Sequence, residues 1–257
     1  MRIGFGVSAN NLRDYRDQLF QLPLIELEDF LFPGFSDESQ DSLPVIQASL
    51  AGYPGEILLS GPYIDLNPGT PDRLIQKVVQ QRFAQALDFA DGIQAKEIIF
   101  LSTFLPIIRL PMYDEDWVAR SIDFWRAFMQ TVDPSLTISL CNTFEAHPDY
   151  LVQVVEGVGR QNFRLAFDLG HFLVFAEISL LAWLRRITTA CSTVYVHSND
   201  GKVDTHAEPF QGILRQDQVA LLKQYLPEKT RLIAKPFNKS AIPACVAWIE
   251  SAFEVEA

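Results

Sequence analysis

The residues best suited to metal binding or proton transfer gather in the second half of the chain. Three of the four histidines lie between residues 168 and 206, each within a few positions of an aspartate. The candidate metal ligands are Asp168, His171, His197, Asp204 and His206. Imidazole nitrogens and carboxylate oxygens suit Zn²⁺ or Mn²⁺. One histidine alone is usually a packing residue, but five such residues favour a shared polar site holding one divalent metal ion.

Six further polar residues closely follow apolar runs and are candidates for contact with a substrate. The expected substrate-binding residues are Glu28, Ser60, Asn142 and Asn199. The expected catalytic residues are His171, Lys235 and Glu145. His171 and Glu145 are candidate bases for proton abstraction. The alternative role of Glu145 is to cap the helix that follows near Pro148.

Short apolar runs rich in β-branched residues alternate with longer segments of helical periodicity. We expect strands at residues 3–7, 24–28, 56–59, 97–101, 137–140, 163–167, 194–197 and 231–234. Apolar residues at helical spacing predict helices over about 75–90, 118–129 and 242–253. Thr70 and Pro71 predict the start of the first of these helices. The alternation indicates consecutive βα units.

Eight βα units without a linker or a compositional break predict an α/β protein with one domain over residues 1–257, a single (β/α)₈ TIM barrel. The alternative is an open, doubly wound sheet. No GxGxxG turn follows the first predicted strand, so we expect no nucleotide cofactor. In a barrel of this kind the C-terminal strand ends form the active site. The polar residues above should therefore converge on one rim.

Composition and charge narrow the classes of partner. The chain of 257 residues has a net charge of −11 and 48% hydrophobic residues, which is typical of a globular protein. The acidic balance disfavours nucleic acid and anionic membranes as partners. The three cysteines form no CxxC pair, and the start of the chain has no signal-peptide pattern. We therefore expect a cytoplasmic protein.

The order of the motifs resembles the xylose isomerase-like TIM-barrel superfamily, which includes sugar-phosphate isomerases and epimerases and endonuclease IV (AP endonuclease family 2). The resemblance rests on FDLGH at 167–171, VHSNDG at 196–201 and DTH at 204–206. The segment NTFE at 142–145 is similar to the one that follows the family's fifth strand, and IELE at 25–28 is similar to its second strand. The resemblance implies a small carbohydrate-type ligand at the rim and a homo-oligomer, although no residue identifies an interface.

Two positions depart from the family pattern. The family's metal site takes an aspartate and a histidine, which match Asp168 and His197, together with two glutamates. Cys141 and Lys235 stand at the two glutamate positions. An ammonium placed about 4 Å from a second positive charge costs on the order of 4 kcal/mol at an effective dielectric constant of 20. The usual four-ligand or dinuclear site is therefore not expected.

Two hypotheses account for this altered site. In the first, Lys235 replaces the metal, pairs with Asp168 and polarises a substrate oxygen. In the second, one metal ion is held by His171, Asp204 and His206, which correspond to the ligands of one zinc in endonuclease IV. Three protein ligands leave an open position, as a catalytic zinc requires.

Three functions follow in order of preference. The first is an isomerase or epimerase acting on a sugar or sugar phosphate, through proton abstraction next to a carbonyl. The second is a non-catalytic or repurposed barrel that binds a carbohydrate-like ligand or a protein, because both family glutamates are absent. The last is an endonuclease IV-like nuclease, which the acidic charge disfavours.

Overall fold

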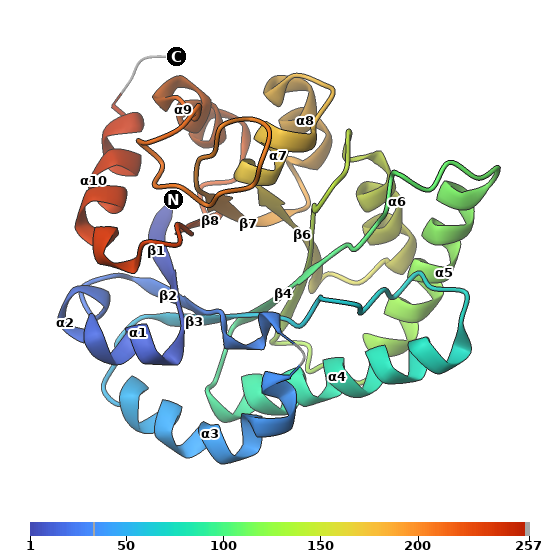
Figure 1. Ribbon diagram of the computed structural model, residues 1–257, viewed down its shortest axis with the longest axis horizontal. Coiled ribbons are helices and arrows are strands. Elements are labelled where there is room, and N and C mark those ends of the chain that lie inside the picture. Colours follow the sequence, from blue (N-terminus) through green and yellow to red (C-terminus); the bar gives the residue numbers. More distant parts are fainter. Residues whose placement is uncertain (33, 255–257) are drawn as a thin grey trace.

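The chain folds into a closed barrel of eight parallel strands arranged in sequence order (Figure 1). The computed structural model describes residues 1–32 and 34–254. The strands are β1 (Arg2–Val7), β2 (Leu24–Leu27), β3 (Glu56–Ser60), β4 (Glu97–Leu101), β5 (Thr137–Cys141), β6 (Phe163–Asp168), β7 (Cys191–Val196) and β8 (Arg231–Ala234). Strand β8 closes onto β1, where Phe5 pairs with Ala234. The predicted (β/α)₈ barrel is confirmed, with β7 starting three residues earlier than expected.

Helices connect the strands and surround the barrel (Figure 1). They are α1 (Ala9–Asp14), α2 (Arg16–Leu19), η1 (Asp29–Leu31), α3 (Phe35–Leu50), α4 (Arg73–Gly92), α5 (Tyr113–Phe128), α6 (Asp149–Val158), α7 (Leu169–Phe175), α8 (Leu180–Ile187), α9 (Gln216–Tyr225), η2 (Lys239–Ala241) and α10 (Ile242–Ala252). Helices α4, α5 and α10 match the three predicted ones. Helix α4 starts at Arg73 and not at Pro71, because its N-cap is Asp72 and not Thr70: the Asp72 carboxylate accepts hydrogen bonds from the N–H groups of Leu74 and Ile75.

Alternate residues of each strand face two different apolar environments. The outward side chains, such as Phe5, Phe100 and Phe167, pack in a large core against the helices. The inward side chains form a smaller cluster inside the barrel, which consists of Leu24, Leu58, Ile99, Cys141, Ala166, Tyr195 and Ile233. Because both faces of the strands are buried, the strands read as apolar runs in the sequence.

A buried carboxylate and its partners fill the N-terminal end of the barrel. Glu97 accepts hydrogen bonds from Ser139 at 2.5 Å, from Thr193 at 2.7 Å and from Arg231 at 3.1 Å. These contacts tie β4, β5, β7 and β8 together at that end. No helix in the described part of the chain combines the length and the apolar character needed to cross a bilayer.

Candidate functional site

A cavity of about 720 Å³ lies at the C-terminal mouth of the barrel. Its lining consists of Ser8, Glu28, Asp29, Leu31, Phe32, Phe35, Glu38, Ser60, Tyr63, Ile99, Leu101, Asp168, His171, Tyr195, Asp204, His206, Lys235 and Phe237. Seven of the predicted site residues are among them: Glu28, Ser60, Asp168, His171, Asp204, His206 and Lys235. The structure thus brings together residues that are far apart in the sequence.

Asp168, the last residue of β6, is fixed by contacts on all sides. Its Oδ1 accepts a hydrogen bond from the N–H of His171 at 2.8 Å, which caps α7, and lies 2.9 Å from Nε2 of His197. The Asn142 side chain binds the Asp168 backbone at 2.7 Å and 3.0 Å. Burial raises the pKa of Asp168, but the rings of His171 and His197 outweigh it and hold that pKa below its usual range. Asp168 is therefore an ionised anchor for both histidines.

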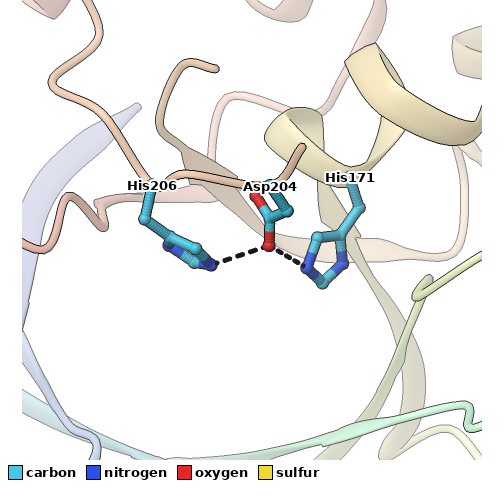
Figure 2. Close-up of side chains that lie close together, drawn as sticks. All are labelled: His171, Asp204 and His206. Carbon is cyan, nitrogen blue, oxygen red and sulfur yellow. Dashed lines mark ion pairs between the residues drawn. The ribbon is translucent and has the colours of Figure 1, made fainter. Parts of the chain in front are cut away.

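Three side chains converge beside this anchor, and we call them the His–Asp–His triad: His171, Asp204 and His206. Figure 2 shows both imidazole rings pointing toward the carboxylate between them. Oδ2 of Asp204 lies 3.2 Å from Nε2 of His171 and 3.1 Å from Nε2 of His206. One potential ligand atom from each residue lies within 4.8 Å of the other two. The spacing suits three ligands of a single metal ion.

The outer nitrogen of each triad histidine is held by a backbone carbonyl. Nδ1 of His171 lies 2.9 Å from the carbonyl oxygen of Asn142, and Nδ1 of His206 lies 2.8 Å from that of Lys235. A carbonyl only accepts, so each Nδ1 carries the hydrogen and, in the neutral ring, Nε2 presents a lone pair. Metal-binding histidines are commonly oriented in this way.

His206 occupies a constrained position. Its ring stacks on His197, with centroids 3.8 Å apart, and on Phe237, with centroids 4.6 Å apart. Its backbone has φ +44°, in the left-handed region that is uncommon for residues other than glycine. Backbone strain of this kind is concentrated at functional sites. The two stacked rings hold the imidazole toward Asp204.

Two buried polar atoms beside the triad have no hydrogen-bond partner within the described chain. They are Nδ1 of His197 and Oδ1 of Asp204, which lie 3.7 Å apart. Burial lowers the pKa of His197, which favours the neutral ring, so both atoms act as acceptors. Buried acceptors without a donor cost free energy, which a cation at this place would reduce. The triad and this unpaired carboxylate oxygen therefore fit a divalent cation.

The charges of the triad agree with such a site. Burial lowers the pKa of His171, but the carboxylates of Asp168 and Asp204 outweigh it and raise that pKa to about 9. Burial raises the pKa of Asp204, but hydrogen bonds from His171 and His206 hold it well below its usual range. Without a metal, a proton on His171 supplies positive charge to the cluster. A bound cation would take the place of that proton.

Lys235 forms another part of the cavity wall, and its ammonium is fixed by buried partners. Nζ lies 2.7 Å from Oε2 of Glu26, 2.8 Å from Oγ of Ser60 and 3.9 Å from the centre of the Tyr195 ring. Burial lowers the pKa of Lys235, but the carboxylates of Glu26 and Glu28 outweigh it and raise that pKa. Lys235 therefore carries a positive charge at neutral pH.

The expected pairing of Lys235 with Asp168 is wrong. Among the described residues, the carboxylates within 4.0 Å of the Lys235 ammonium belong to Glu26 and Glu28. Asp168 is occupied instead by the two histidines and by the start of α7. The positive charge of Lys235 and the anchor of the histidines thus belong to separate clusters on one cavity wall.

Glu26 and Tyr195 contact the Lys235 ammonium, and neither was predicted from the sequence as a site residue. Glu26 is fully buried inside β2 and accepts hydrogen bonds from Ser60 at 2.8 Å and from the Tyr195 hydroxyl. A signal was present, because a glutamate within the apolar strand LIEL requires a buried positive partner. That partner is 209 positions away in the chain, so its identity could not be read from neighbouring residues.

The expected substrate contacts of Asn142 and Asn199 do not fit the structure. Neither side chain is part of the described cavity lining. Both polar atoms of Asn142 bind the Asp168 backbone. Asn199 donates to the carbonyl oxygen of Gly170 at 2.8 Å and accepts from the N–H of Gly201 at 2.9 Å. Both amides position backbone, because their hydrogen-bonding groups are already used.

Glu145 is also outside the described cavity lining, so the expected role as a catalytic base does not fit. Its carboxylate accepts hydrogen bonds from the Ser102 hydroxyl and, at 2.5 Å, from the N–H of Thr143. The alternative role is wrong as well, because Pro148 is the N-cap of α6 and no side chain caps that helix. Glu145 instead joins the loops that follow β4 and β5.

The β5 position at which the resemblance implies a glutamate holds a buried cysteine. Cys141 is fully buried in the apolar cluster inside the barrel. Burial raises the pKa of its thiol well above the ordinary value, so the thiolate that binds metals is not formed. Cys141 therefore offers no carboxylate ligand where the resemblance implies one, and the His–Asp–His triad is the candidate metal centre.

No protein-family model matches the chain. A sequence relative, the uncharacterized protein MJ1311 of Methanocaldococcus jannaschii, is 20% identical over 172 residues. The match covers 62% of this chain and 57% of that relative, so this chain corresponds to little more than half of the relative's length.

Solved structures match nearly the whole chain. A D-tagatose 3-epimerase-like protein matches with TM-score 0.79 and 15% identity, over 99% of this chain and 97% of that one. The TTHB071 protein from Thermus thermophilus, soaked with ZnCl₂, matches with TM-score 0.76 and 20% identity over all of both chains. A xylose isomerase domain protein from Planctomyces limnophilus matches with TM-score 0.66 and 13% identity, over 98% of this chain and 95% of that one. The chain has the fold of the xylose isomerase-like TIM barrels, as its motifs implied.

Proposed function

We propose that this barrel is a metal-dependent enzyme of the sugar isomerase or epimerase type, which moves a proton next to the carbonyl of a small polyhydroxy substrate. One observation carries the proposal: the His–Asp–His triad and the charged Lys235 line the same cavity at the C-terminal mouth. The triad offers ligands for a cation, and Lys235 offers a fixed positive charge. Stabilising the enediolate formed by proton abstraction requires positive charge near its oxygens.

His171, Asp204 and His206 would hold a divalent cation such as Zn²⁺ or Mn²⁺, which when bound would polarise a substrate oxygen. The similar fold of the TTHB071 protein, studied after soaking with ZnCl₂, supports zinc as the first cation to test. His171 then serves as a ligand and not as the base, because its Nε2 faces Asp204.

Lys235 and Glu28 carry the substrate-facing charges away from the triad. The Lys235 ammonium, held by Glu26 and Ser60, is oriented before substrate arrives and can stabilise a developing negative oxygen. Burial raises the pKa of Glu28, but the ammonium groups of Lys235 and Lys239 outweigh it and lower that pKa. Glu28 is therefore ionised and can accept a proton or the hydrogen bonds of substrate hydroxyls.

A carbohydrate-binding barrel without turnover is the second candidate. The observation that favours it is the loss of both family glutamates, since Cys141 is buried away from the described lining and Lys235 is engaged by Glu26. Such a protein would use the same cavity and the same polar contacts. Turnover distinguishes the two functions.

The test combines zinc binding with a turnover assay. Zinc is titrated into three dialysed proteins: wild type, His206→Ala and the control His147→Ala. His147 pairs with Asp149 and is not part of the described cavity lining. Wild type and His147→Ala should bind one equivalent tightly, and His206→Ala should lose that affinity. A panel of ketoses and ketose phosphates is then assayed chromatographically for zinc-dependent isomers, with Glu28→Gln expected to be inactive. Zinc binding without turnover favours the second candidate, and no zinc uptake by the wild type overturns the metal-dependent proposal.

A further inference from the structure

We infer that the cavity takes a neutral sugar that keeps a free carbonyl and carries an apolar substituent, such as an aryl or alkyl ether, and not a sugar phosphate. This inference rests on the proposed function and narrows its substrate class. It follows from three properties of the cavity wall: its charge, the placement of its apolar residues and its volume.

The charge of the wall disfavours a phosphate. The described lining includes five carboxylates, from Glu28, Asp29, Glu38, Asp168 and Asp204. Its lysine, Lys235, is already paired with Glu26 at 2.7 Å. The nearby Lys239 is paired with Glu28 at 2.8 Å. Each ammonium is already balanced by a carboxylate, so the wall has no surplus positive charge for a phosphate dianion, and even a divalent cation at the triad would leave carboxylates in excess. Sites that bind phosphate use unopposed arginine, lysine or backbone N–H groups.

The apolar residues of the wall gather on particular elements. Leu31, Phe32 and Phe35 follow β2, Ile99 and Leu101 belong to β4, and Phe237 follows β8. Phe32 is 63% exposed and Phe237 is 69% exposed. Burying an exposed phenyl ring under a ligand is favourable because it removes apolar surface from water. This part of the wall is suited to an apolar group.

The triad and most of the apolar residues lie on different sides of the mouth, and the carboxylates of Glu28, Asp29 and Glu38 share the β2 side with those apolar residues. The triad and Asp168 come from the ends of β6 and β7, whereas most of the apolar residues come from β2 and β4. In a closed barrel with strands in sequence order, β2 lies across the mouth from β6. A ligand that contacts both sides therefore needs a polar head for the triad and an apolar part for the opposite wall.

The volume agrees with this division. The cavity measures about 720 Å³. Pockets of about 300–1,000 Å³ enclose drug-sized ligands, which are larger than a monosaccharide. A single hexose at the triad would leave the exposed phenyl ring of Phe32 in water. An aryl or alkyl substituent on the sugar would occupy that remaining space.

The test measures the binding of three probes to zinc-loaded protein by calorimetry and saturation-transfer NMR. The probes are methyl β-D-glucopyranoside, phenyl β-D-glucopyranoside and D-glucose 6-phosphate. Burial of the phenyl ring should make the phenyl glucoside bind about tenfold or more tightly than the methyl glucoside. Glucose 6-phosphate should bind more weakly than either glucoside, because the carboxylates repel it.

Two variants locate the apolar contact. Phe32→Ala removes an exposed cavity phenyl and should abolish most of the phenyl glucoside's advantage. The matched control Phe210→Ala removes a 42% exposed phenyl outside the described lining and should leave that advantage unchanged.

The inference is overturned if glucose 6-phosphate binds most tightly, if the two glucosides bind equally, or if neither glucoside binds. Its failure is separable from that of the proposed function. Zinc uptake and ketose turnover with equal binding of the two glucosides would retain the proposed function and remove the inference. Tighter binding of the phenyl glucoside than of the methyl glucoside, without zinc uptake or turnover, would retain the inference and remove the proposed function.

Discussion

Lys235 and Glu26 form a buried ion pair, with Nζ 2.7 Å from Oε2, that joins the ends of β8 and β2 across β1. Gly6 of β1 leaves room for the neighbouring Glu28 side chain, because a Cβ at this position would lie 2.4 Å from Oε1 of Glu28. Where the family resemblance implies a metal-binding glutamate, this chain thus has an internal cation with its own counterion.

Removing one member of this pair should destabilise the fold. Lys235→Met leaves the Glu26 carboxylate buried without a cation, and we expect the free energy of unfolding to fall by about 3 kcal/mol. The double variant Glu26→Gln with Lys235→Met removes both charges and should lose less. Urea denaturation of the three proteins measures the difference. A single variant as stable as the double variant would show that the pair does not contribute in this way.

Asn142 should support the metal centre without binding the metal. Its side chain holds the Asp168 backbone, so Asn142→Ala leaves the buried Asp168 N–H unpaired. We expect a loss of about 2 kcal/mol in unfolding free energy and about 10-fold to 100-fold weaker zinc binding. Asn162→Ala is the control, because that amide binds the carbonyl oxygen of Leu136 at 2.9 Å and is not among the described cavity-lining residues. Equal zinc affinity in both variants would contradict this role.

The glycine of the FDLGH motif is required by its neighbour. A Cβ on Gly170 would lie 1.9 Å from Cε1 of His197, so Gly170→Ala must displace that ring from Asp168. We expect Gly170→Ala to lose about 2 kcal/mol or more of stability and to weaken zinc binding. Gly34→Ala is the matched control, since a Cβ there meets nothing within 4 Å. Thermal unfolding that is unchanged in Gly170→Ala would be inconsistent with this packing.

Asp29 should make stability depend on pH. Burial raises the pKa of Asp29 from 3.8 to about 6. The hydrogen bond from the Ala9 N–H lowers that pKa, but burial outweighs it. The folded state therefore keeps this proton to higher pH than the unfolded state, and stability falls as pH rises from about 3.8 to 6.

Asp29→Asn removes this titration while keeping an acceptor for Ala9. We expect the variant to be about 3 kcal/mol more stable than wild type at pH 8 and nearly equal to it at pH 4. Asp133→Asn is the control. The exposed Asp133 carboxylate accepts hydrogen bonds from Ser135, which lower its pKa, so this variant should gain no stability at pH 8. A constant difference between Asp29→Asn and wild type from pH 4 to pH 8 would disprove the linkage.

The sequence was sufficient for the barrel and for the residues that gather at its mouth. Strands buried on both faces read as apolar runs, and their regular alternation with helical stripes leaves few other arrangements. In a parallel barrel every strand ends at the same rim, so residues after the strands, such as Asp168, Ser60 and Lys235, had to converge. That argument depends on topology alone and not on side-chain conformation.

Tertiary structure decided which partner each side chain takes. Asn142, Asn199 and Glu145 follow strands just as Ser60 does, yet their polar groups bind backbone or hydroxyl groups outside the described cavity lining. Lys235 pairs with a carboxylate 209 positions away, that of Glu26 on β2, although it was expected to pair with Asp168. Hydrogen bonds and ion pairs act over a few ångströms. A shift of one residue in the position at which a strand ends and its loop begins therefore decides which partner a side chain reaches. The pattern of residue types fixes the rim, but only the folded backbone sets these distances.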